Sequence, residues 1–330
     1  MHLSYAQNLE DYHLDLVLAD VTDGVYVDVG GGHPVADNVS FFFYLKGWRG
    51  LVVEPQVALA AAYKGIRPRD HVTSCLAGRS DGVVDFHIVD GMHGLSSAVK
   101  ANADSASRYG ATYRTEPREV RRLSRLIDEA GLDHIDFLKI DVEGAEADVL
   151  GGLDLARHRP RVILVEAVNP NVADGDLQQW EPTLTAAGYD FVLFDNLNRF
   201  YLAREHADLK IRFLAKPRPW HEIGHLWNSG RVLDKSDHPD RALGETLAKG
   251  LMALLPQLPE LLLVQLIEAG LKTDNAVPPS EIIATLIGSA EWPGRATPHP
   301  TGITSLVATD RFKAALGRIS CMYDGGHLQT

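Results

Sequence analysis

Residues 25–34 read Val-Tyr-Val-Asp-Val-Gly-Gly-Gly-His-Pro, and this stretch decides the fold. Its first half is typical of a buried β-strand, because Val and Tyr fit a pleated surface. Gly30, Gly31 and Gly32 then let the backbone turn tightly and approach a ligand, since glycine has no Cβ. A helix after such a turn adds amide groups and the positive end of its dipole, which suit a carboxylate or a phosphate. The stretch predicts a ligand site at the end of a strand.

The next expected strand ends in an acid, Glu54, followed by Pro55. Glu54 lies roughly 20 residues after the turn, where a carboxylate can accept hydrogen bonds from two ribose hydroxyls. A dinucleotide-binding turn would have glycine where this chain has Val35, which disfavours a pyrophosphate ligand. The two features together predict a nucleoside that carries an amino-acid-like end. The alternative is an ordinary strand–turn–helix junction with a surface Glu.

Short apolar runs alternate with amphipathic stretches from Gly24 to Ala203, which is typical of a parallel sheet flanked by helices. The short Asp195–Asn198 connection predicts an antiparallel hairpin after the parallel strands. We expect a doubly wound α/β sheet of five parallel strands plus this hairpin. The expected strands are Val25–Val29, Gly50–Glu54, Val72–Ala77, Ile135–Asp141, Val162–Ala167, Tyr189–Phe194 and Arg199–Ala203. The expected helices are Val35–Lys46, Gln56–Lys64, Glu119–Ala130, Ala145–Leu150 and Asp176–Ala187.

Beyond Lys216, prolines punctuate apolar helical stretches without a clear strand. We therefore expect a sheet domain over residues 1–215 and a mostly helical C-terminal extension over 216–330. The extension includes a short amphipathic helix at 311–319. Residues 251–271 are apolar at helical spacing, and an exposed face of that size would favour a homo-oligomer. Residues 221–225, His-Glu-Ile-Gly-His, match a zinc-hydrolase pattern, which we set aside because Gly224 weakens the helix that the pattern needs.

The composition limits the classes of partner. The 330 residues include 32 Lys and Arg against 44 Asp and Glu, a net charge of −12, which argues against a nucleic-acid ligand. Two cysteines cannot form a disulfide framework, so a reducing compartment is expected. The chain shows no signal-peptide pattern and no apolar run near the roughly 20 residues that span a bilayer. We expect a cytoplasmic protein without a membrane span.

Several segments resemble one family. They are residues 5–11 (Tyr-Ala-Gln-Asn-Leu-Glu-Asp), 26–34, 47–50 with Glu54-Pro55, 135–146 (Ile-Asp-Phe-Leu-Lys-Ile-Asp-Val-Glu-Gly-Ala-Glu) and 198–201. Over roughly residues 4–215 the chain is similar to FkbM-type S-adenosylmethionine-dependent methyltransferases. The resemblance implies a Rossmann-like methyltransferase sheet with a pocket for S-adenosyl-L-methionine.

The resemblance also implies which residues form that pocket. They are Asp28, Gly30 and Gly32 at the methionine end, Glu54 and Pro55 at the ribose, and Cys75, Leu76 and Ala77 at the adenine. Gln7, Asn8 and Glu10 match a family segment that closes over the cofactor. The alternative for that segment is the plain start of an amphipathic helix.

Acids follow two neighbouring strands of the expected sheet. Asp141 and Glu143 come after one strand, and Glu166 ends the next. The carboxyl ends of adjacent parallel strands meet at one edge, so we expect these side chains near an acceptor. A hydroxyl becomes a good nucleophile only when a base takes its proton or a metal lowers its pKa. We favour direct base chemistry by His33, Asp141 or Glu143, because no ligand spacing here is diagnostic of a metal.

A divalent metal is the alternative for the acceptor side. Asp141 and Glu166 would hold it together with Asp195 or Asn196, since such ions prefer oxygen ligands. Lys139 has a different interpretation. Alternation places it on the opposite face of its strand from Ile140, where a lysine needs a carboxylate partner or a route to solvent. We interpret it as structural.

These expectations combine into a function. The resemblance implies O-methylation, with a sugar hydroxyl of a glycan or polysaccharide precursor, or a natural product, as the acceptor. One alternative is a non-catalytic methyltransferase-fold module that binds a partner. Another is an NAD-dependent oxidoreductase, which Val35 and the missing Tyr-x-x-x-Lys pair disfavour.

Overall fold

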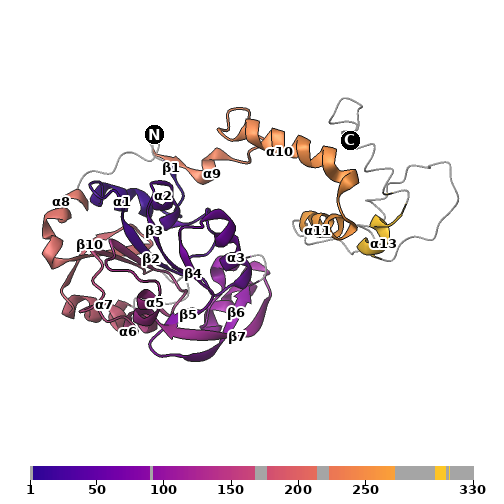
Figure 1. The fold of residues 1–330 in the computed structure, drawn as a ribbon. Helices are drawn as coiled ribbons and strands as arrows, with labels where there is room; N and C mark the ends of the chain where they lie inside the picture. Colours follow the sequence, from indigo (N-terminus) through magenta and orange to yellow (C-terminus); the bar gives the residue numbers. More distant parts are fainter. Residues whose placement is uncertain are drawn as a thin grey trace. The chain divides into compact units, whose positions relative to one another are not determined.

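The structure is a computed structural model that describes residues 3–89, 92–167, 177–213, 223–271, 302–309 and 312. The chain divides into two compact units, residues 1–228 and 229–330. Figure 1 shows the path of the chain with its elements labelled. The mixed α/β class predicted from the sequence is confirmed, and the sequence-based boundary after residue 215 stays a prediction.

A seven-stranded sheet forms the centre of the first unit (Figure 1). Strands β4, β3, β2, β8 and β9 run parallel to one another, and the hairpin of β11 and β10 continues the sheet in antiparallel pairing. In their order across the sheet the strands are β10 (Tyr189–Phe194), β11 (Asn198–Ala203), β9 (Val162–Glu166), β8 (Phe137–Ile140), β2 (Val25–Val29), β3 (Arg49–Val53) and β4 (His71–Thr73).

The two faces of this sheet bury different residues of the same strands. Val27, Leu138 and Ile163 belong to one hydrophobic core, and Tyr26 and Phe137 belong to the other. This alternation follows from the period of two along a strand. It places Asp28 and Lys139 on the same face as Tyr26 and Phe137, so the predicted position of Lys139 opposite Ile140 is confirmed.

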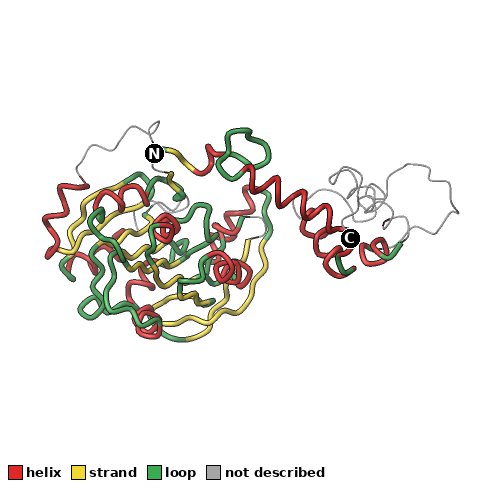
Figure 2. The backbone as a smooth tube through the Cα atoms, turned by 45° about the horizontal axis from the view of Figure 1, so that its top comes forward, coloured by secondary structure: helices red, strands yellow, loops and turns green. Residues whose placement is uncertain are grey.

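Helices cover both faces, as in a doubly wound sheet. Leu14, Phe43, Tyr63 and Phe213 pack into the core on the Tyr26 face; these residues come from α1 (Glu10–Val17), α2 (Val39–Leu45), α3 (Val57–Ile66) and α8 (Lys210–Phe213). Leu126, Val149 and Leu184 pack on the opposite face; they come from α5 (Leu123–Glu129), α6 (Glu146–Gly151) and α7 (Leu177–Ala186). Figure 2 shows these helices in red around the yellow strands.

Helix α2 begins later than the sequence predicts. The expected start was Val35, but the helix starts at Val39, and the Asn38 side chain caps it by accepting a hydrogen bond from the amide of Phe41 at 2.8 Å. Asn is a preferred cap because its side-chain oxygen satisfies a free amide of the first turn. Residues 34–38 therefore belong to the turn that follows the glycines.

A second, three-stranded sheet corrects two sequence predictions. It contains β5 (Leu76–Gly78), β7 (Tyr113–Arg122) and β6 (Gly82–Val89), and α4 (Lys100–Ser105), η1 (His93–Leu95) and η2 (Ala106–Tyr109) lie between β6 and β7 along the chain. The expected strand Val72–Ala77 is divided between β4 in the main sheet and β5 in this one. The expected helix Glu119–Ala130 is strand up to Arg122, because these residues pair with β6 and β5. Such non-local pairing overrides local helix propensity.

The region after Lys216, expected to lack a clear strand, contributes a short one. Strand β12 (Gly224–His225) pairs in parallel with β1 (Leu3–Ser4) at the start of the chain. The first unit also contains η3 (Arg204–Leu209), and α9 (Leu226–Ser229) follows β12. The zinc-hydrolase pattern lies partly outside the described residues, at His221 and Glu222.

The described part of the second unit is helical, and Figure 2 draws it in red and green. Its elements are α10 (Arg241–Leu254), η5 (Leu255–Gln257), α11 (Glu260–Leu271) and α13 (Ile303–Val307). Leu263 and Val307 form the buried centre of its small hydrophobic cluster. The expected helix at 311–319 lies outside the described residues except for Phe312. Among the described residues, no helix has both the length and the apolar character that crossing a bilayer requires.

Candidate active site

A cavity of about 400 Å³ lies at the carboxyl ends of β2, β3, β8 and β9. This volume is in the range of pockets that hold small ligands. The sequence-predicted site residues that line it are Gln7, Gly30, Gly32, His33, Glu54, Pro55, Cys75, Leu76, Ala77, Asp141, Glu143 and Glu166. Asn8, Glu10 and Asp28 are not among the lining residues.

The glycine turn lies against the end of β8. Gly30 has a φ of +79°, and a Cβ at this position would lie 1.7 Å from the carbonyl oxygen of Asp141. Only glycine therefore fits this close approach. The amides of Gly30 and Gly31 donate to the carbonyl oxygen of Val53 at 2.9 and 3.3 Å, which fixes the turn to the end of β3.

Glu54 is a buried carboxylate that the turn itself contacts. Its Oε2 accepts a hydrogen bond from the amide of Gly32, and its Oε1 accepts one from the amide of Gln56, both at 2.7 Å. Burial raises the pKa of Glu54 to about 7, although these two hydrogen bonds act in the opposite direction. A carboxylate has about four lone-pair sites, so two further donors can still bind.

An apolar wall lines another side of the cavity. Ala77 lies in β5 and Cys75 directly precedes that strand. The buried ring of Phe86, in β6, forms another part of the wall. Phe86 is absent from the predicted site residues because β6 is not among the predicted strands. The run of β-branched and aromatic residues from Val83 to Val89 was the signal that could have found it.

Three acids meet at the opposite side of the cavity. Asp141 and Glu143 follow β8 and Glu166 ends β9, and one carboxylate oxygen from each lies within 4.8 Å of the other two. Burial, followed by the charge of Asp141, raises the pKa of both Glu143 and Glu166. Three carboxylates at this spacing can share protons or hold a divalent cation.

Lys139 provides the positive charge next to these acids. Its Nζ lies 3.1 Å from Asp141 Oδ2 and 3.6 Å from Asp28 Oδ1, and it donates to the carbonyl oxygen of Gly30 at 3.1 Å. Burial alone would lower the pKa of Lys139, but the carboxylates of Asp141 and Asp28 raise it. The predicted need for a carboxylate partner is confirmed, and Lys139 also lines the cavity.

His33 uses one ring nitrogen to fix its own loop. Its Nδ1 accepts hydrogen bonds from the amides of Val35 at 3.1 Å and Ala36 at 3.0 Å. A neutral ring with its Nδ1 lone pair occupied carries its proton on Nε2. The geometry therefore favours His33 as a hydrogen-bond donor rather than as the base considered from the sequence.

The N-terminal segment meets the hairpin rather than the cavity, except at Gln7. The Asn8 side chain donates to the carbonyl oxygen of Asp195 at 2.6 Å, and the Asn198 side chain donates to Glu10 Oε1 at 2.7 Å. Burial and the charge of Asp195 raise the pKa of Glu10 to about 8. The described acids that could group around a metal do not include Asp195, which was one expected ligand.

Comparison with known proteins identifies the family. Residues 28–191 match the family model described as the methyltransferase FkbM domain, a stretch that includes the glycine turn, Glu54 and the three acids. The chain belongs to the FkbM methyltransferase family. Methyltransferases of this family depend on S-adenosylmethionine, as the sequence resemblance implied.

Two similar proteins match parts of this FkbM chain. The 2-O-methyltransferase NoeI of Sinorhizobium fredii is 30% identical over 129 residues, which cover 36% of this chain and 53% of NoeI. The AMB antimetabolite synthetase AmbE of Pseudomonas aeruginosa is 40% identical over 74 residues, which cover 22% of this chain and 4% of AmbE. The chain thus matches about half the length of NoeI and a small fraction of AmbE.

A solved structure shows a weaker likeness. The O-methyltransferase from Bacillus cereus in complex with SAH is 11% identical, with a TM-score of 0.31, over 60% of this chain and 82% of that one. This likeness is too low to support an inference about the FkbM chain.

Proposed function

We propose that the FkbM domain binds S-adenosylmethionine in this cavity and that its acids direct methyl transfer to a hydroxyl group. The acceptor that we propose is a sugar hydroxyl of a glycan, a polysaccharide precursor or a glycosylated natural product. The observation that carries the proposal is that one cavity joins the glycine turn, the buried Glu54 and the three acids.

The residues around the cavity fit a nucleoside with an amino-acid end. Glu54 has lone pairs for two ribose hydroxyls after it accepts its two amide hydrogen bonds. Phe86 and Ala77 provide an apolar surface for a purine. At Gly32 a Cβ would meet no atom within 4 Å, so the turn leaves open space for the methionine end.

S-adenosylmethionine, when bound, supplies an electrophilic methyl group. The chain must hold the acceptor oxygen about 3 Å from the methyl carbon and take the hydroxyl proton. We assign that proton to Glu143, whose pKa burial and Asp141 raise to about 8, close to the pH at which a general base works well. Burial and the charges of Asp141 and Glu143 also raise the pKa of Glu166, so the group of acids can retain a proton near neutral pH and donate it in a hydrogen bond.

The likeness to NoeI supports an oxygen atom as the acceptor of the methyl group. NoeI is described as a 2-O-methyltransferase, and this chain is 30% identical to it over 129 residues. The net charge of −12 also suits a neutral sugar better than a nucleic acid.

Calorimetry with S-adenosylhomocysteine tests the cofactor site. We expect the wild-type protein to bind it, and Glu54→Ala to bind at least about tenfold more weakly because two ribose hydrogen bonds are lost. Glu268→Gln on α11, an exposed acid of the second unit, is the matched control and should bind like the wild type. No binding by the wild type, or equal binding by Glu54→Ala, overturns the proposal.

A transfer assay tests the chemistry. With radiolabelled S-adenosylmethionine and a panel of oligosaccharides and glycosylated small molecules, label should enter a hydroxyl of one class. Glu143→Gln should reduce the rate by about 10²–10⁴-fold, the usual contribution of a general base, without weakening S-adenosylhomocysteine binding. Full activity of Glu143→Gln contradicts the assignment.

The grouping of Asp141, Glu143 and Glu166 supports a second route, in which these acids hold a divalent cation. The two routes differ in one measurement. Direct base chemistry predicts the same transfer rate after treatment with EDTA, whereas the cation route predicts a loss that Mg²⁺ or Mn²⁺ restores.

A further inference from the structure

We propose that Arg67 is a positioning residue of the methyltransferase: one buried network around its guanidinium holds both the glycine turn and the acid Asp141. Arg67 belongs to none of the motifs in the sequence, and it does not line the cavity. The inference rests on the proposed function, because the turn and the acid matter to catalysis only if the cofactor binds there.

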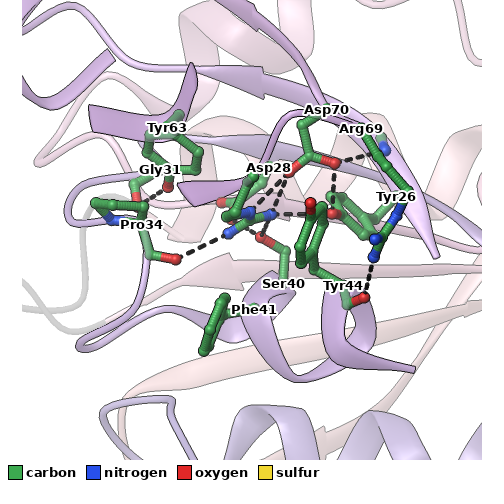
Figure 3. A network of polar contacts seen from close by, with 12 residues as sticks. Tyr26, Asp28, Gly31, Pro34, Ser40, Phe41, Tyr44, Tyr63, Arg69 and Asp70 are labelled. Atoms are coloured by element: carbon green, nitrogen blue, oxygen red, sulfur yellow. Dashed lines mark hydrogen bonds and ion pairs between the residues drawn. The ribbon is translucent and has the colours of Figure 1, made fainter. Parts of the chain in front are cut away.

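The guanidinium of Arg67 is completely buried, and each of its three nitrogens donates hydrogen bonds. Nε donates to Asp70 Oδ2 at 2.7 Å, and Nη2 donates to the hydroxyls of Tyr26 and Ser40, both at 2.9 Å. The rings of Tyr63 and Tyr44 flank it, with centroids 4.8 and 5.3 Å from Cζ. Figure 3 labels these partners, Tyr26, Ser40, Tyr44, Tyr63 and Asp70, in one network of polar contacts. A buried charge costs stability unless its hydrogen bonds are made, so this geometry is tightly determined.

One arm of the network leads to the glycine turn. Arg67 Nη1 donates to Asn38 Oδ1 at 2.9 Å and to the carbonyl oxygen of Pro34 at 3.3 Å. The side-chain Nδ2 of Asn38 then donates to the carbonyl oxygen of Gly31 at 2.8 Å, and the Tyr63 hydroxyl donates to the same oxygen at 2.7 Å. The carbonyl oxygens of Gly31 and Pro34 therefore accept hydrogen bonds from residues of this buried network. Figure 3 shows Gly31, Pro34 and Tyr63 together.

The other arm leads to the acid. Ser40, which accepts from Arg67, donates to Asp28 Oδ2 at 2.6 Å. The second oxygen of Asp28 faces Lys139 Nζ at 3.6 Å and makes no hydrogen bond. Lys139 in turn contacts Asp141 and the carbonyl oxygen of Gly30, both at 3.1 Å. A change at Arg67 therefore reaches the turn through Asn38 and Pro34, and it reaches Asp141 through Ser40, Asp28 and Lys139. The two arms are joined, because Ser40 Oγ also donates to Asn38 Oδ1 at 3.1 Å and Lys139 also donates to Gly30.

Lysine could not replace this guanidinium. Its single ammonium has three donors on a flexible stem, whereas the planar fork of arginine reaches five acceptors in fixed directions. We expect Arg67→Lys, if it folds, to weaken cofactor binding and slow methyl transfer together.

Two milder variants separate the arms. Asn38→Asp keeps the acceptor for Arg67 and the cap of α2 but replaces the donor to Gly31 by a carboxylate oxygen. We expect its Kd for S-adenosylhomocysteine and its KM for S-adenosylmethionine to rise about tenfold with little change in kcat. Its Tm should fall as well, because a carboxylate oxygen would face the carbonyl oxygen of Gly31. Ser40→Ala removes the link between Arg67 and Asp28. We expect it to lower kcat by several-fold while the cofactor Kd stays within about threefold of the wild type.

The outcomes separate a positioning role from a merely structural one. If Asn38→Asp and Ser40→Ala lower Tm but leave Kd, KM and kcat unchanged, the network only stabilises the fold and the inference is overturned. Should Asn38→Asp fail to fold, Tyr63→Phe removes a single donor to Gly31 and should raise the cofactor Kd in the same direction; an unchanged Kd overturns the inference.

Hydrogen exchange distinguishes this inference from the proposed function. If the wild type does not bind S-adenosylhomocysteine, the proposed function fails, but amide exchange of peptides from residues 28–38 still reports on the turn. Asn38→Asp should speed exchange there in the free protein, with peptides of α10 as the internal control. Unchanged exchange at 28–38 overturns the positioning of the turn.

Discussion

Glu54 is a carboxylate whose charge depends on pH near neutrality. Burial raises its pKa to about 7, and the amides of Gly32 and Gln56 oppose this shift without cancelling it. In the free folded protein Glu54 is therefore mostly protonated below pH 7. Its raised pKa contributes stability that is fully present below about pH 4.5 and is lost as the pH rises from there through about 7. Ribose hydroxyls favour the ionised form, which accepts their hydrogen bonds.

Binding should therefore strengthen as Glu54 ionises. We expect the affinity of the wild type for S-adenosylhomocysteine to rise by about tenfold between pH 6 and pH 8, because a group with a pKa of about 7 changes from mostly protonated to mostly ionised over that range. Calorimetry at several pH values measures it. Glu54→Gln should bind more weakly and lose this rise, and an equal rise in that variant would assign the effect to another group.

At the scale of elements, the hairpin of β10 and β11 fixes the N-terminal segment. Asn198, at the start of β11, is 3% exposed and donates to Glu10 Oε1, and Asn8 donates to the carbonyl oxygen of Asp195 in the hairpin turn. These contacts join residues that are far apart in the sequence. They hold the segment from which Gln7 reaches the cavity.

Removing the contact between these elements should destabilise the protein. We expect Asn198→Ala to lower the free energy of unfolding by about 1–3 kcal/mol, because the buried Glu10 loses a partner. Urea unfolding measures the change. Asp190→Asn on β10 is the control: its ion pair with Arg204 is exposed, so the effect should stay below about 1 kcal/mol. Equal effects of the two variants would mean that the contact between the hairpin and Glu10 stabilises the fold no more than an exposed ion pair does.

At the scale of the whole molecule, the chain divides after Asn228, and the described residues that line the cavity run from Gln7 to Glu166. The FkbM match also ends before that division, at residue 191. The described lining of the proposed cofactor site thus lies within the first unit.

A shortened chain tests whether the first unit suffices. We expect a protein that ends at Asn228 to bind S-adenosylhomocysteine with a Kd within about threefold of the full chain, because all the described residues that line the cavity are retained. Calorimetry on both proteins, with circular dichroism as a check of folding, measures this. A folded but non-binding shortened chain would show that residues 229–330 contribute to cofactor binding.

Much of the site could be predicted from the sequence alone because its signals are local. Three glycines after an apolar strand, an acid at the end of the next strand, and acids after β8 and β9 all lie at strand ends, and parallel strands bring those ends to one edge. The resemblance placed three further residues in the pocket, Asn8, Glu10 and Asp28, and none of them lines the cavity. Each one instead makes a hydrogen bond with another element: Asn8 with Asp195, Glu10 with Asn198 and Asp28 with Ser40.

The sequence by itself determined the α/β class, the glycine turn and the acids at the strand ends, since these follow from short-range patterns of period two and from glycine's missing Cβ. Only the tertiary structure decided that residues 119–122 are strand, that Lys139 joins Asp28 to Asp141, and that Arg67 is buried behind the turn. Each of these depends on contacts between segments far apart in the chain. Local propensity does not encode such contacts, and only the packed fold brings the partners together.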